Sequence, residues 1–109
     1  MARSPQRVIV EYTAQAVADL DQIWLWNAEH YSAQHAEAYI SYLRSETTKL
    51  LQLPNPGRPV PSREVFRYSL LRHRRRGAGH LVVFTIDTKT RRVLRYFHTG
   101  QDWENAFAE

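Results

Sequence analysis

The spacing of hydrophobic residues divides the chain into a helical first half and a second half made of strands. Apolar and polar positions alternate over residues 7–12, as in a half-buried strand. Hydrophobic residues then recur every three or four positions over 14–29 and again up to about residue 53, which predicts two amphipathic helices. Thr13 and Ser32 stand just before these helices, where their hydroxyl groups can accept hydrogen bonds from N-terminal amides.

A proline-rich segment separates the helices from the strands. Residues 54–61 contain four prolines, which end the second helix because proline lacks a backbone N–H. Strand periodicity follows over residues 65–72, 80–87 and 91–99, and the links are so short that neighbouring strands must be antiparallel. A last turn of helix is predicted over residues 102–108.

These elements predict a two-layer α+β fold with the order β-α-α-β-β-β and a short C-terminal helix. The short link between the long helices makes them an antiparallel hairpin, which packs on one face of a mostly antiparallel four-stranded sheet. The pattern leaves the position of the first strand in the sheet open. The other face is expected to be largely uncovered and to carry the function. Residues 1–109 are expected to form one domain.

Composition excludes several classes of protein. Hydrophobic residues make up 43% of the chain and charged residues 24%, as in a folded soluble protein. The absence of cysteine excludes a disulfide scaffold, a thiolate metal site and a cysteine nucleophile. The N-terminus has no long apolar segment, so we expect a cytoplasmic location rather than secretion. His73 and His80 bracket a hairpin without a suitably spaced third ligand, so no metal and no cofactor is expected.

Charge is distributed unevenly along the chain. Residues 1–54 hold four basic and six acidic side chains, whereas residues 55–109 hold eleven basic and five acidic ones. Thirteen of the 15 basic residues are arginines, whose planar guanidinium groups suit phosphate or carboxylate. A polyanionic or acidic partner explains this bias, and so does arginine use that serves only solubility.

The arginines gather in and beside the predicted sheet. Arg67 and Arg95 fall within strands, where a charged side chain must reach the open face or be buried at high cost. Such a face can hold single-stranded nucleic acid or an acidic protein segment. Residues 74–76 can equally be a solvated hairpin tip. The expected target-binding residues are Arg67, Arg72, Arg74, Arg75, Arg76 and Arg95.

A possible catalytic group lies near the end of the last strand. Tyr96 and His98 are two residues apart and therefore share a face. Histidine is a natural general acid or base near neutral pH, and Arg67 or Arg95 can hold a phosphate, so these four residues make a candidate metal-independent ribonuclease site. Alternatively, Leu94 joins Tyr96 and His98 in a core-facing row that ends in a hydrogen-bonded histidine.

Five short segments follow one another over nearly the whole chain: ADLDQIW (18–24), AEAYISYL (36–43), LPNPGR (53–58), LVVFTID (81–87) and YFHTGQD (96–102). Together and in this order, they resemble the RelE/ParE superfamily of bacterial toxins from toxin–antitoxin pairs. The Pro-Gly-Arg turn at 56–58 and the His-x-x-Gln-Asp ending at 98–102 are more similar to the ParE branch, often called plasmid stabilisation toxins.

The resemblance implies a toxin that is neutralised by a cognate antitoxin encoded nearby. In the ParE branch it implies inhibition of DNA gyrase. RelE-type members instead cleave messenger RNA on the ribosome, using basic side chains and a late tyrosine or histidine. The predicted sheet contains no lysine, which departs from the RelE pattern. We therefore expect a gyrase inhibitor without enzymatic activity, with a ribosome-dependent ribonuclease as the alternative.

The antitoxin is expected to contact both aromatic and basic residues. Trp26 falls away from the main apolar stripe of the first helix, and an exposed tryptophan is typical of a partner contact, although a wide stripe can also shield part of its ring. An acidic antitoxin segment would neutralise arginines and cover Trp26 or the neighbouring helix groove. The expected antitoxin-binding residues are Trp24, Trp26, Arg58, Arg67 and Arg72.

Overall fold

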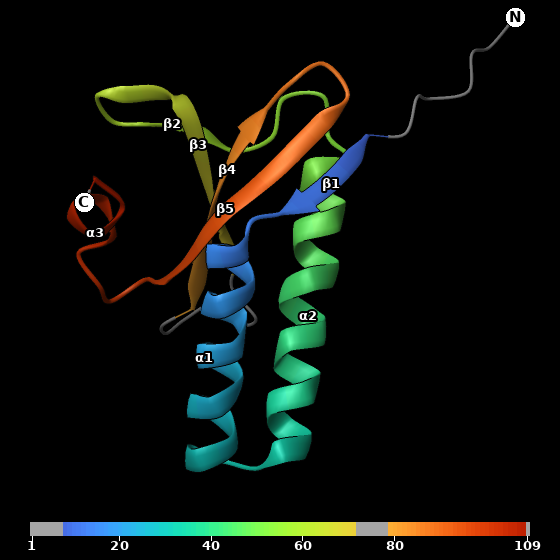
Figure 1. The fold of residues 1–109 in the computed structure, drawn as a ribbon, viewed down its shortest axis with the longest axis vertical. Helices are drawn as coiled ribbons and strands as arrows, with labels where there is room; N and C mark the ends of the chain where they lie inside the picture. Colours follow the sequence, from blue (N-terminus) through green and yellow to red (C-terminus); the bar gives the residue numbers. More distant parts are fainter. Residues whose placement is uncertain (1–7, 72–78, 109) are drawn as a thin grey trace, which may run out of the picture.

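The computed structural model describes residues 8–71 and 79–108. Its elements are, in order, β1 (Ile9–Tyr12), α1 (Ala14–His30), α2 (Ala33–Leu51), β2 (Arg58–Val60), β3 (Arg63–Leu71), β4 (His80–Ile86), β5 (Thr90–His98) and α3 (Trp103–Ala108). The α+β class, the helix hairpin, the mostly antiparallel sheet and the short C-terminal helix are thus confirmed (Figure 1).

The sheet has five strands rather than the predicted four, in the order β1-β5-β4-β3-β2. The additional strand, β2, lies within the segment that was predicted to be only a loop. It is three residues long and forms the sheet edge, where the missing N–H of Pro59 removes no bond to a further strand. At the opposite edge, β1 pairs in parallel with β5, which settles the position that the sequence left open.

Both predicted caps are present at the starts of the long helices. The Thr13 hydroxyl accepts a hydrogen bond from the Ala16 N–H at 3.1 Å, and the Ser32 hydroxyl accepts one from the His35 N–H at 3.0 Å. These bonds satisfy amides that have no partner within the helix. The two hydroxyl groups therefore fix where each helix begins.

The main core lies between the helix hairpin and one face of the sheet. Helix residues such as Leu20 and Leu43 pack there with Phe84 and Val93 of the sheet, all 4% exposed or less. The link between the two helices lies far from the strands, so the tip of the hairpin projects beyond the sheet (Figure 1). This projection leaves the tip-side halves of both helices without a sheet beneath them.

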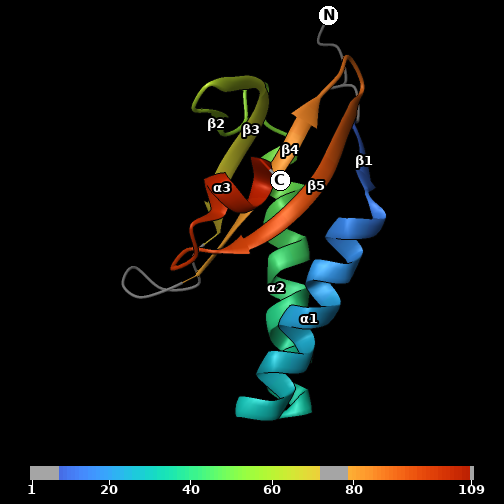
Figure 2. The same cartoon turned by 60° about the vertical axis from the view of Figure 1, so that its left-hand side comes forward.

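The second face of the sheet is covered by the chain itself, so the expectation of a largely open face was wrong. Val60, Leu81, Val83 and Phe97 are buried there in a second core. The short helix α3 lies over this face (Figure 2) and places two aromatic side chains on it. The Trp103 ring lies 4.7 Å from that of Tyr68, and the Phe107 ring 5.0 Å from that of Phe66. Aromatic side chains on this face require such cover.

A β-bulge in β5 changes which residues share a face. Val83 pairs with Arg95 and Phe84 with Val93, which leaves Leu94 as the extra residue. Side-chain alternation therefore shifts by one, so that Val93 and Tyr96 both enter the main core while Leu94 packs in the second core. Leu94, Tyr96 and His98 were predicted to share one core-facing side of the strand. The bulge makes this prediction wrong for Leu94.

Gly57 occupies a position that other residues cannot adopt without strain. Its φ is +70°, and a Cβ there would lie 2.6 Å from the Tyr68 carbonyl oxygen and 2.9 Å from Cζ of Phe84. We expect Gly57→Ala to lower the free energy of unfolding by about 3 kcal/mol, from backbone strain and overpacking together. Urea denaturation measures this, with Gly100→Ala as the control, since its Cβ would meet only the exposed His98 ring. Equal stability of the two variants would contradict the account.

Candidate functional site

A groove of about 930 Å³ lies between the tip-side half of the helix hairpin and the end of the sheet. It exists because the hairpin projects past the strands, as Figure 1 shows. Its helical side includes Trp26, Tyr31 and Tyr39, and its sheet side includes His80 and His98. The groove therefore combines an aromatic wall with a polar end.

The aromatic wall is exposed to an unusual degree. Trp26 is 51% exposed and Tyr31 is 64% exposed. The Trp26 ring stacks on His30 with 4.0 Å between ring centres, and the Tyr31 ring lies 4.5 Å from that of His35. His30 Nδ1 also donates to the Trp26 carbonyl at 2.8 Å, which holds the stack in place. An ordered, solvent-exposed aromatic cluster of this kind is typical of a binding surface.

The polar end of the groove is built around His80. The Tyr39 hydroxyl lies 2.6 Å from His80 Nδ1, and the His98 ring meets His80 edge-to-face at 5.3 Å between ring centres. Burial, with a smaller contribution from His98, lowers the pKa of His80 from 6.5 to about 4. Burial, together with the nearby Tyr42, raises the pKa of Tyr39 to about 12. Both groups are therefore neutral at pH 7.

The lowered pKa of His80 makes the stability of the fold depend on pH. In the unfolded chain His80 takes up a proton near pH 6.5, but in the folded chain only near pH 4. Between these values the unfolded state binds more protons, so stability falls as the pH falls, by about 3 kcal/mol for this shift. Urea denaturation at pH 7 and pH 4 measures the loss. His80→Gln carries no titrating group and should lose about 3 kcal/mol less over the same interval; equal losses would contradict the assignment.

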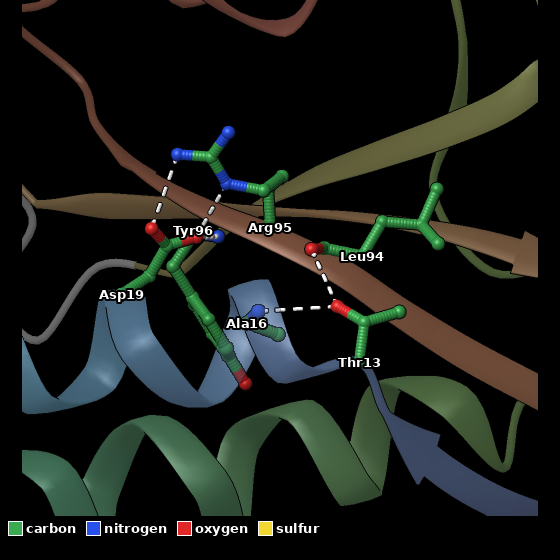
Figure 3. Close-up of polar contacts among 6 residues, drawn as sticks. All are labelled: Thr13, Ala16, Asp19, Leu94, Arg95 and Tyr96. Carbon is green, nitrogen blue, oxygen red and sulfur yellow. Dashed lines mark hydrogen bonds and ion pairs between the residues drawn. The ribbon is translucent and has the colours of Figure 1, made fainter.

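The first half of α1 replaces a neighbouring strand along β5 where β1 ends (Figure 3). The Thr13 hydroxyl donates to the Leu94 carbonyl at 2.9 Å. Further along, the Asp19 carboxylate accepts three hydrogen bonds: from Arg95 Nε at 2.7 Å, from Arg95 Nη2 at 3.1 Å and from the Tyr96 backbone N–H at 2.9 Å. The Arg95 guanidinium also lies over the Phe97 ring at 4.7 Å. These contacts join the start of the hairpin to the strand that forms the groove's edge.

Comparison with known proteins identifies the family of this fold. A family model described as "ParE toxin of type II toxin-antitoxin system, parDE" matches residues 10–103. The chain belongs to the ParE toxin family. The fold is also similar to a solved structure titled "Chromosomal ParDE TA system from P. aeruginosa", with a TM-score of 0.67 and 23% identity over 82% of this chain and 92% of that chain. No curated protein matches the sequence.

In this ParE-family chain, the two arginines expected on an open face are held internally. Arg67 Nε donates to the Pro56 carbonyl at 2.7 Å and its Nη2 to the Gly57 carbonyl at 2.9 Å, so Arg67 fixes the loop after α2. Arg95 is paired with Asp19 and only partly exposed. Of these two, only Arg95 lines the groove. The other expected target-binding residues, Arg72, Arg74, Arg75 and Arg76, lie outside the described residues.

The four residues of the candidate ribonuclease site are not all brought together. Tyr96 is 3% exposed, and its hydroxyl lies 2.7 Å from that of Thr47 inside the main core. Burial raises the pKa of this hydroxyl well above its usual value. Arg67 is bound to the loop after α2, whereas Arg95, Tyr96 and His98 line the groove. Tyr96 therefore contributes its backbone to the groove's edge and its ring to the core.

The expected antitoxin-binding residues are dispersed over the molecule. Trp26 lines the groove, whereas Trp24 does not line it and donates from Nε1 to the Glu37 carboxylate of α2 at 3.0 Å. Arg58 is exposed at the start of β2, away from the groove. Of Trp24, Trp26 and Arg58, Trp26 is therefore the residue that lies beside the other aromatic side chains of the groove.

The sequence pattern did not single out Tyr39, and it marked His80 only as half of an insufficient metal-binding pair. Tyr39 stands in the apolar stripe of α2 and His80 at the start of a strand, 41 residues away. The available signal was the hairpin register, which pairs His80 directly with His98. Within residues 8–71 and 79–108, no group of three or more acidic, histidine or cysteine side chains is placed to hold a metal ion. No helix in these ranges combines the length and apolar character needed to cross a membrane.

Proposed function

We propose that this ParE-family protein is the toxin of a type II toxin–antitoxin pair, that it inhibits DNA gyrase and that a cognate antitoxin neutralises it. The observation that carries the proposal is the family-model match over residues 10–103. The solved neighbour is itself titled a ParDE system, and its likeness to this chain supports a shared fold. Acting on gyrase places the protein in the cytoplasm.

The groove supports the antitoxin part of the proposal. The side chains of Trp26 and Tyr31 are both more than half exposed. A partner that covers these rings removes their apolar surface from water, which stabilises the complex. The residues that line the groove run from Tyr31 and His35 at the hairpin tip to His98 at the end of β5, so a helical or extended segment can lie along it. We propose that the antitoxin binds there.

We propose inhibition by binding rather than by catalysis. A ribonuclease of the type considered above needs basic and acid–base groups around one scissile phosphate. Here the Tyr96 hydroxyl is in the core and Arg67 is engaged with backbone carbonyls. Gyrase inhibition makes no such demand on the described residues.

The test is to induce the protein in bacteria from a tightly repressed promoter and follow DNA and protein synthesis by pulse labelling. We expect DNA synthesis to fall first, a reporter plasmid to lose negative supercoils, and growth to recover when the adjacent reading frame is co-expressed. Early arrest of protein synthesis with cleaved messages, while plasmid supercoiling is unchanged, would favour the ribonuclease alternative and overturn the proposal.

A further inference from the structure

The two histidines at the sheet end of the groove are both oriented by bonds to Nδ1. His80 and His98 are direct cross-strand partners, and both line the groove. The Gly100 backbone N–H donates to His98 Nδ1 at 3.1 Å, so the proton of the neutral His98 ring is on Nε2. The Tyr39 hydroxyl is 2.6 Å from His80 Nδ1. We assign the hydroxyl as the donor, because a phenol donates more strongly than a neutral imidazole N–H and an imidazole nitrogen is the stronger acceptor of the two. His80 then also carries its proton on Nε2.

Both Nε2–H groups therefore lack an acceptor in the described part of the chain. Asp19 is the carboxylate that lines the groove, but its oxygens already accept three hydrogen bonds from Arg95 and Tyr96. Arg95 is in turn neutralised by that carboxylate. A partner that enters the groove can therefore match these histidine donors with acceptors of its own. A carboxylate is the strongest such acceptor for neutral N–H donors.

The opposite side of the groove is aromatic and suits an apolar side chain of the partner, next to the partner's carboxylate. Trp26 and Tyr31 are exposed; the Trp26 ring stacks on His30, and the Tyr31 ring lies against His35 in a tilted arrangement. A residue that packs on these rings would be buried, whereas a residue facing His80 and His98 would be hydrogen-bonded. The two requirements together describe a peptide segment with acidic and large apolar side chains on one surface.

We propose that the groove holds an antitoxin segment through an acidic side chain whose carboxylate accepts hydrogen bonds from Nε2 of His80 and of His98, while an adjacent apolar side chain packs on Trp26 and Tyr31. The inference rests on the proposed function, because the antitoxin is the occupant it names. Carboxylate recognition by a pair of imidazole groups gives specificity to a contact that the aromatic wall alone would leave unselective.

The first test measures antitoxin affinity for His98 variants. The probe is the product of the reading frame adjacent to this gene, purified and titrated calorimetrically into the wild-type chain, His98→Ala and His98→Gln. His98 is exposed, so its loss leaves the fold intact, which circular dichroism checks. We expect His98→Ala to weaken binding roughly 10-fold or more, as for a lost charge-assisted hydrogen bond, and His98→Gln to retain part of the affinity through its amide N–H.

The outcomes separate this inference from the proposed function. Unchanged affinity of His98→Ala in a complex that still forms overturns the carboxylate contact and leaves the toxin proposal standing. If His98→Ala no longer inhibits gyrase but binds the antitoxin as tightly as the wild-type chain, the groove contacts gyrase rather than the antitoxin. That result also overturns the inference. A wild-type chain that binds no product of the adjacent reading frame overturns the neutralisation proposal, and with it the named occupant.

A second test needs only the free chain. Phenylacetate presents a carboxylate beside an aromatic ring, and phenylacetamide is its neutral counterpart. We expect phenylacetate to shift the ¹⁵Nε2 resonances of His80 and His98 saturably, and phenylacetamide at the same concentration to shift them much less. Equal shifts with both compounds, or none with phenylacetate, would contradict recognition of a carboxylate.

Discussion

Replacing Asp19 by alanine is expected to lower the free energy of unfolding by about 4 kcal/mol, as for removal of one partner from a largely buried ion pair. The Asp19 side chain is 17% exposed and that of Arg95 is 29% exposed, so solvent replaces the lost contacts only in part. The substitution leaves the Arg95 guanidinium without its counter-charge and the Tyr96 N–H without its acceptor. It also removes the link between α1 and the part of β5 that extends past β1.

Equilibrium urea denaturation of Asp19→Ala measures this loss. Asp21→Ala is the matched control, because it removes a carboxylate from the same helix at an exposed position that makes no hydrogen bond or ion pair with the described residues. We expect the control to change stability by less than about 0.5 kcal/mol. Similar losses in the two variants would show that the three hydrogen bonds to Asp19 do not stabilise the fold as described.

Replacing Trp26 by alanine is expected to weaken antitoxin binding by about 100-fold, the effect of removing a central aromatic anchor from an interface. Trp26 is 51% exposed, so its removal should leave the stability of the free chain nearly unchanged. The ring forms the wall of the groove together with Tyr31, and its stacking on His30 holds it ready for a partner at a low entropic cost.

Leu25→Ala provides the matched control for Trp26→Ala. Leu25 is 46% exposed on the same helix, but it does not line the groove. Calorimetric titration with the purified antitoxin should therefore find near wild-type affinity for Leu25→Ala and strongly reduced affinity for Trp26→Ala. If both variants bind as tightly as the wild-type chain, the antitoxin covers a different surface.

Most of the fold could be predicted from the sequence because residues close together in the chain determine where its helices begin and how they are connected. The helix starts follow from the Thr13 and Ser32 hydroxyl groups, and the hairpin follows from the short link between the helices. The edge strand β2 could not be predicted, since three residues that include Pro59 have no periodicity to detect. The parallel pairing of β1 with β5 joins segments about 80 residues apart, and no local signal reports such a contact.

The candidate site was predicted only in part, because its residues depend on partners distant in the sequence. Trp26 and His98 were found from their own positions, and both line the groove. Arg67 and Arg95 were expected to face a partner, but the carbonyls after α2 and the Asp19 carboxylate hold them. A charged side chain on a strand can be satisfied inside the molecule, and periodicity alone does not show this.

We propose that this ParE-family chain inhibits gyrase and that an antitoxin bound in the groove relieves the inhibition. The most direct measurement is the supercoiling of relaxed plasmid by purified gyrase in the presence of the purified chain, with and without equimolar antitoxin. We expect dose-dependent loss of supercoiling that the antitoxin reverses, with a weaker reversal for Trp26→Ala. Full supercoiling activity in the presence of a folded chain that arrests growth when expressed would contradict it.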